Sequence, residues 1–169
     1  FGFIEMFDPK FQPWTGGGMH FSFFNQPVAA QKNFKSFCSS LKPLLNSNKK
    51  ALEELEEIEN NFAKVMQEKM EKMWAKKLGI SKFDIKLFEE LINLMIETKV
   101  DYTIFFRELS NIPDDMSSLE KSFYGSSENE DIKSRWNNWL EKWKSFINVN
   151  DKESTQKLSN QMKLTNPKY

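Results

Sequence analysis

The chain has 169 residues, and its 24 Lys and Arg residues balance its 24 Asp and Glu residues. A neutral chain of this length suits one domain or part of one, and it lacks the basic excess of nucleic-acid-binding or acidic-membrane-binding surfaces. A single cysteine, Cys38, excludes an internal disulfide and fits a reducing intracellular compartment. No apolar run approaches the roughly 20 residues that cross a bilayer, so we expect neither a nucleic-acid partner nor a membrane partner.

Residues 1–25 show no helical periodicity. They contain seven of the 16 Phe residues of the chain and a run of three glycines at 16–18. So many aromatic residues among turn-forming residues predict an irregular segment that packs against another part of the protein. The chain opens on Phe1-Gly2 without an initiator Met, which leads us to expect a piece of a larger protein.

From Pro27 onward the apolar residues recur three and four positions apart, which predicts helices. Pro27 suits a first helical turn because its missing N–H would be unpaired there, and Pro43 is expected to end or bend this first helix. The longest predicted helix, 50–78, is followed by Gly79, a plausible C-terminal cap. Further helices are predicted at 84–98, 102–110, 115–123, 130–147 and 151–164.

The predicted organisation is therefore an irregular region at 1–25 followed by a helical region at 26–169, and the fold class is all-α. A polar stretch at 125–129 is the expected flexible linker. The last helix has a thin apolar stripe that buries little, so we expect fraying or packing against a partner outside this chain.

Two features of the N-terminal region invite a ligand-binding interpretation. The glycines at 16–18 expose backbone N–H groups that could hold a phosphate, but no Lys-Ser/Thr follows them, so a mobile loop tip is favoured. His20 is the only histidine, and no other ligand lies near it at metal-site spacing, so packing among its Phe neighbours is favoured.

Asp8 is a candidate for a structural role. The following Pro9 holds Asp8 in an extended conformation. Its carboxylate could accept hydrogen bonds from backbone amides and brace the surrounding segment, and the alternative is plain exposure to solvent.

Three features of the helical region have simple structural interpretations. The tryptophan row that begins at Trp136 could stack on a base, but only one basic residue, Lys142, is interleaved with it, so a buried helix face is favoured. Asp114-Asp115 could suggest paired carboxylates or a calcium loop, but the calcium-loop spacing is absent, so a helix start is favoured. No basic residue adjoins Cys38 in the sequence, where it stands between Phe37 and Ser39, which favours a buried small side chain over an activated thiolate.

Several short motifs, in register along the chain, resemble the selenoprotein O family. They are Gly2-Phe3-x-x-x-Phe7-Asp8-Pro9 with Asn25-Gln26-Pro27, then Asp101-Tyr102-Thr103-x-Phe105-Phe106-Arg107, and finally Trp136-x-x-Trp139-Leu140-x-x-Trp143 with Asn166-Pro167-Lys168-Tyr169. The resemblance implies a protein-kinase-like fold, of which this chain would be a C-terminal-lobe fragment. It also implies a parent enzyme that transfers AMP from ATP to Ser, Thr or Tyr hydroxyls of proteins.

The resemblance further implies that ATP and magnesium bind to the parent protein and not to this fragment. The magnesium-binding Asp of the family would precede Phe1, and its catalytic residues would lie further upstream, so no catalytic, cofactor-binding or metal-binding residue is assigned here. Residues 1–25 would correspond to an activation segment, with Asp8 as a bracing residue near the active site. The implied partners are the rest of the kinase-like domain and the protein substrates, and self-association through exposed apolar surface is a further expectation. For a eukaryotic source, the resemblance is compatible with a mitochondrial location.

One departure from the family pattern supports an alternative. Where family members carry Asn-x-Ser-Asp-x-x-Gly-Arg-Tyr, this chain has Trp14-Thr15-Gly16-Gly17-Gly18-Met19-His20-Phe21. The loss of these polar residues motivates a second hypothesis, in which the chain belongs to a degenerate pseudokinase and acts as a non-catalytic helical scaffold or interaction module.

Overall fold

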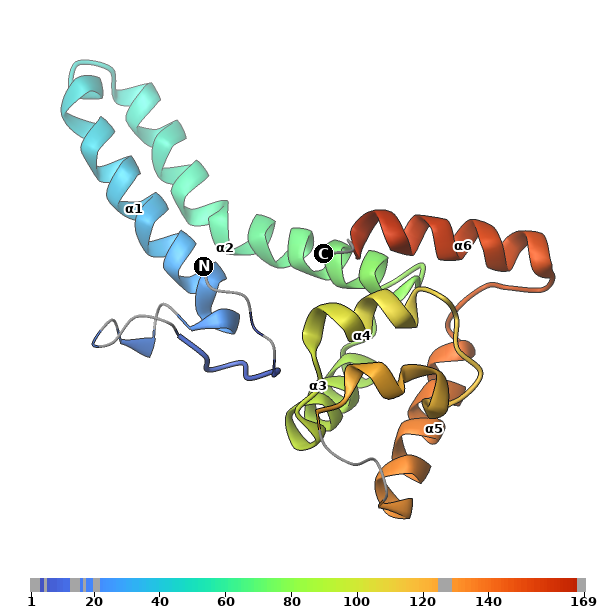
Figure 1. The fold of residues 1–169 in the computed structure, drawn as a ribbon. Coiled ribbons are helices and arrows are strands. Elements are labelled where there is room, and N and C mark those ends of the chain that lie inside the picture. Colours follow the sequence, from blue (N-terminus) through green and yellow to red (C-terminus); the bar gives the residue numbers. More distant parts are fainter. Residues whose placement is uncertain are drawn as a thin grey trace. The chain divides into compact units, whose positions relative to one another are not determined.

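The computed structural model describes residues 4, 6–12, 16, 18, 19, 22–124 and 129–166. These residues are mainly helical and contain no β-strand, which confirms the predicted all-α class. The elements are the 3-10 helices η2 (Phe23–Asn25) and η3 (Met116–Ser122) and the α-helices α1 (Gln26–Leu45), α2 (Lys49–Leu78), α3 (Ile85–Thr98), α4 (Tyr102–Leu109), α5 (Glu130–Lys144) and α6 (Lys152–Thr165) (Figure 1). No helix in the described ranges is long and apolar enough to cross a membrane.

An Asp or Asn side chain caps the N-terminus of each of the later helices. In α3, for example, the carboxylate of Asp84 accepts a hydrogen bond from the backbone N–H of Leu87 at 2.8 Å. Such a bond satisfies one of the backbone donors that a helix start leaves unpaired. The caps explain why the helix starts were predictable, and those of α4, η3, α5 and α6 are Asp101, Asp115, Asn129 and Asp151.

The predicted cap at the end of the long helix α2 is confirmed. Gly79 has a φ of 67°, and the N–H of Ile80 donates to the carbonyl of Ala75 at 3.0 Å. This left-handed turn closes the helix in a conformation that glycine adopts without a Cβ clash. Pro43 lies in the last turn of α1, which continues to Leu45.

Two predicted elements differ from the structure. The helix predicted at 115–123 is the 3-10 helix η3, in a segment whose Asp and Ser side chains compete for backbone hydrogen bonds. The helix predicted at 130–147 ends at Lys144, although Ile147 is still buried. The apolar periodicity therefore marked a buried residue correctly but overstated the length of the helix.

The chain forms two compact units. One comprises residues 9–70, and the other comprises residues 71–166 together with the described part of the 4–8 segment. In the first unit, the rings of Phe34 and Phe62 stack with their centroids 4.8 Å apart, and Cys38 is buried as predicted.

The core of the second unit is built around the tryptophan row of α5. Trp136, Trp139 and Trp143 are all buried, so the predicted core face of this helix is confirmed. The indole N–H of Trp143 donates to the carbonyl of Leu78 at 2.7 Å, and that of Trp139 donates to the carbonyl of Leu87 at 3.0 Å. These bonds fix α5 against the end of α2 and the start of α3.

Candidate functional site

The segment around Phe7 is packed at the junction between α3 and α4. Phe7 is 3% exposed, and its backbone N–H donates to the carbonyl of Val100 at 2.7 Å. Its ring stacks on that of Tyr102 with the centroids 5.7 Å apart, and Met6 forms an antiparallel bridge with Asp101. For this part of the N-terminal region, the prediction that it packs against another part of the protein is confirmed.

Asp101 is the central polar residue of this junction. One carboxylate oxygen caps α4 by accepting from the N–H of Ile104 at 2.8 Å, and the other accepts from the hydroxyl of Tyr124 at 2.8 Å. Its own N–H donates to the carbonyl of Ser122 at 2.7 Å. Because both oxygens of this buried carboxylate accept hydrogen bonds, we assign it a structural role that joins the start of α4 to the end of η3.

Asp8, the candidate bracing residue, directly follows the packed Phe7 and is exposed. The proposed bracing role of its carboxylate stays a prediction. Gly16 and Gly18 have positive φ angles of 78° and 73°, as expected for a glycine turn. His20 and Gly17 lie outside the described residues.

A second polar cluster joins the end of α2 to α4 and to the end of α6. The ammonium of Lys77 donates to the side-chain oxygen of Asn166 at 3.1 Å and lies 4.8 Å from the ring centroid of Phe106 and 5.3 Å from that of Tyr102. The side-chain amide of Asn166 donates to the carbonyl of Lys77 at 2.9 Å and to the hydroxyl of Ser110 at 3.0 Å. Asn166 is 2% exposed, so these bonds satisfy a buried amide.

Arg107 completes this cluster at the C-terminus of α6. Its guanidinium donates to the carbonyls of Lys163 at 3.3 Å and Asn166 at 3.1 Å. The last carbonyls of a helix have no partners within the helix, and a positive charge is favourable at this end. Arg107 therefore fixes the end of α6 to α4.

The members of this cluster differ in how clearly the sequence marks them. Arg107 and Asn166 stand out only as parts of motifs, and Lys77 does not stand out because α2 is rich in lysine. A signal did exist, since Lys77 lies three residues after Trp74 and directly before Leu78, which places it beside the buried face of the helix.

Burial gives Lys77 a testable effect on stability. It lowers the pKa of this ammonium from 10.5 to about 8. Between these two values the unfolded chain still holds a proton that the folded chain has released, so the free energy of unfolding is expected to rise with pH across this window. The rise should be absent from Lys77→Met, and denaturant titrations of both chains at a series of pH values measure it.

Tyr102 sets the upper limit of this experiment. Burial raises the pKa of its phenol above the ordinary value, so its ionisation favours the unfolded chain once the pH passes about 10. The comparison is therefore made between about pH 8 and about pH 10, where this phenol is protonated in the folded chain. If the free energy of unfolding of Lys77→Met rose with pH as steeply as that of the unmodified chain, Lys77 would not be the source of the rise.

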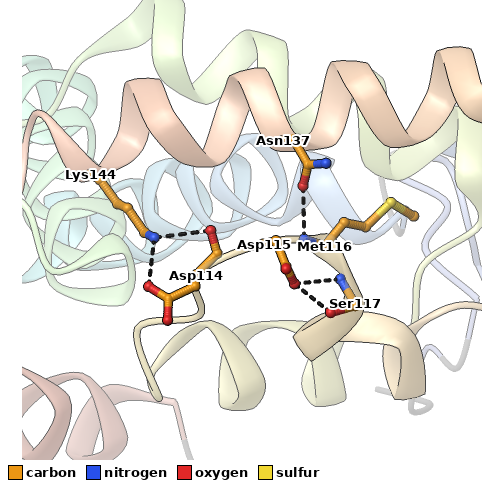
Figure 2. Close-up of polar contacts among 6 residues, drawn as sticks. All are labelled: Asp114, Asp115, Met116, Ser117, Asn137 and Lys144. Atoms are coloured by element: carbon orange, nitrogen blue, oxygen red, sulfur yellow. Dashed lines mark hydrogen bonds and ion pairs between the residues drawn. The ribbon is translucent and has the colours of Figure 1, made fainter.

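The acidic pair Asp114-Asp115 has the structural role that the sequence favoured. The ammonium of Lys144 lies 3.2 Å from the carboxylate of Asp114. Figure 2 shows this contact and shows the carboxylate of Asp115 pointing to Ser117 instead. Asp115 accepts from the N–H of Ser117 at 3.0 Å and caps η3. The hydrogen bond from the Ser117 hydroxyl lowers the pKa of Asp115, which keeps this cap ionised.

The described residues contain no group of three or more His, Cys, Asp or Glu residues that could hold a metal ion. A cavity of about 750 Å³ lies beside the end of α2 and along α6, and its lining includes Lys76 and Lys157 but no carboxylate. We therefore derive no chemical step through a bound nucleotide from this part of the chain.

Comparison with known proteins decides the family. The family model described as protein adenylyltransferase SelO matches residues 1–169, which is the whole chain. The chain belongs to the SelO family. The resemblance seen in the short motifs is thereby confirmed.

Several curated SelO relatives carry the name protein nucleotidyltransferase YdiU. The protein from Aromatoleum aromaticum is 33% identical over 148 residues, which cover 83% of this chain and 28% of that protein. The protein from Flavobacterium johnsoniae is 30% identical, and the match covers 100% of this chain and 34% of that protein. The protein from Brevibacillus brevis is 32% identical, and the match covers 98% of this chain and 32% of that protein. This SelO chain thus spans about a third of the length of these relatives.

Proposed function

We propose that this chain is part of a protein adenylyltransferase that transfers AMP from ATP to Ser, Thr or Tyr hydroxyls of proteins. The match of the SelO family model to all 169 residues carries this proposal. In this proposal ATP and magnesium bind to parts of the parent protein outside this chain, as the family resemblance implies.

In this proposal the chain supplies helical support for the catalytic part of a kinase-like domain. The packing of Phe7 on Tyr102 and the links made by Asp101 would hold the N-terminal segment in a fixed position against α4. Asp8 would then lie where this segment leaves the helices, in place to brace an activation segment. The rest of the parent domain and the protein substrates are the proposed partners.

A second candidate is a non-catalytic scaffold of a degenerate pseudokinase. The glycines at 16–18 favour it, because they replace the polar residues of the family pattern and two of them adopt the left-handed conformation. The two candidates differ in one property of the parent protein, its ability to transfer AMP.

The test uses the full-length parent protein with ATP and magnesium. Mass spectrometry of the parent and of added protein substrates is expected to find AMP attached to hydroxyl side chains. The control is ATP with an isotopic label on either the α- or the γ-phosphate, because AMP transfer carries only the α-label to protein. Incorporation of the γ-label would indicate a kinase instead, and the absence of both labels would favour the scaffold.

A further inference from the structure

The pair of helices in the first unit has a small core. α1 packs against residues 49–70 of α2 through the Phe34–Phe62 stack and an ion pair of 3.7 Å between Lys42 and Glu59. Among the described apolar side chains of this pair, only Cys38 and Leu55 are buried. Helices gain most of their stability from the burial of an apolar face, so two helices with so little buried surface need a further layer.

Five large apolar side chains of this pair are exposed, and four of them, all except Val28, form two rows. Phe37 and Leu44 on α1 are 57% and 78% exposed, and Ile58 and Val65 on α2 are 56% and 48% exposed. The two residues on each helix are seven positions apart, so at about 100° per residue their side chains point in nearly the same direction. Each helix therefore carries a stripe of two exposed apolar residues.

The two stripes lie on the same side of the helix pair. Phe37 follows the inward-facing Phe34 by three residues, and Val65 follows its stacking partner Phe62 by three residues. In an antiparallel pair, a residue that follows an inward-facing residue by three positions points to the same side of the pair, whichever of the two helices carries it. Phe37, Leu44, Ile58 and Val65 thus form one apolar surface, which we call the open face.

The α1 side of the open face carries no charge. On the surface of α1 next to Phe37 and Leu44 lie Asn33 and Ser40, although 28% of the residues of the chain are charged. Interface cores are depleted of charged residues and enriched in aromatic ones, and an exposed apolar patch marks a surface that another layer covers. The α1 side of the open face therefore has the composition of a contact surface, whereas charged residues such as Glu54 and Glu68 lie next to the apolar residues of α2.

We propose that polypeptide of the same protein, from outside residues 1–169, covers the open face. The chain spans about a third of the length of its relatives, so a parent of their length would have most of its polypeptide outside this chain. A covalently linked segment binds at a high effective concentration, which favours it over a second copy, and the uncharged α1 side of the face suits an apolar segment. The inference rests on the proposal that this chain is part of a longer protein, and it does not depend on AMP transfer.

The test places a photo-cross-linking amino acid in the full-length protein at position 37, at position 58 or, as a control, at position 35. Lys35 is exposed and lies on the opposite flank of α1 from Phe37. Positions 37 and 58 are expected to cross-link, within one polypeptide, to peptides outside residues 1–169, and position 35 much less. Cross-links to a second copy, cross-links to residues 71–169, or equal yields at positions 35 and 37 would overturn the proposal.

A second measurement uses smaller changes to the same positions. In full-length protein with Cys38→Ala, the thiol introduced by Phe37→Cys is expected to react with a soluble alkylating reagent roughly tenfold or more slowly than that introduced by Lys35→Cys. If a segment of the same polypeptide covers the open face, the ratio of the two alkylation rates does not depend on protein concentration. Equal rates, or protection that is lost on dilution, would contradict cover by the same polypeptide.

Discussion

Replacing Asp101 with Ala is expected to lower the free energy of unfolding by about 2–4 kcal/mol. The substitution removes the cap of α4, which costs about 1 kcal/mol, and the charged hydrogen bond to the hydroxyl of Tyr124. It also leaves a space at a buried position against which Met6 is paired. Chemical denaturation followed by far-ultraviolet circular dichroism measures the change.

Two variants separate the parts of this effect. Asp84→Ala removes an Asp cap of the same kind from α3, without a tyrosine partner, and should cost only about 1 kcal/mol. Tyr124→Phe removes the hydroxyl and keeps the cap. If Asp101→Ala cost no more than Asp84→Ala, Asp101 would be an ordinary cap and not the link between α4 and η3.

Gly79→Ala is expected to destabilise the chain by about 2–4 kcal/mol. The φ of 67° is unfavourable for a residue with a Cβ, and a Cβ at this position would lie 2.6 Å from the sulfur of Met162 and 3.2 Å from Leu158 Cδ1. Met162 is fully buried, so it cannot move away without disturbing the packing of α6 on the end of α2. The change should appear as a lower denaturation midpoint.

Gly16→Ala provides the matched control. Gly16 has a φ of 78°, close to that of Gly79, but a Cβ there would meet no atom within 4 Å. Gly16→Ala should therefore lower the free energy of unfolding through backbone strain alone, by about 1 kcal/mol. Equal costs at the two positions would show that the close approach of α6 does not contribute.

The helices were largely predictable because their signals are local. Asp84, Asp101 and Asp151 stand directly before apolar periodic segments, and Gly79 directly follows one. Each cap acts within a few residues of itself, so the sequence displays it. The helix predicted at 115–123 exists, but its 3-10 form was not predicted, because the competition of Asp and Ser side chains with a regular helix depends on weak, context-dependent bonds.

The polar clusters were less predictable because their members are distant in sequence. Lys77 and Asn166 are 89 positions apart, and nothing local in either segment indicates that they form a hydrogen bond. The same is true of the indole of Trp143 and the carbonyl of Leu78, although the burial of Trp143 itself followed from helical periodicity. Only the motif resemblance pointed to Asn166, and it did so without naming the partners of this residue.

The central claim is that this helical chain supports AMP transfer whose catalytic residues lie elsewhere in the parent protein. The most direct measurement compares the 169-residue chain with the full-length parent, each incubated with ATP and magnesium and analysed by mass spectrometry for AMP on protein hydroxyls. We predict AMP attachment by the parent and none by the 169-residue chain. Self-attachment of AMP by the 169-residue chain alone would contradict the account, and so would a parent that transfers no AMP.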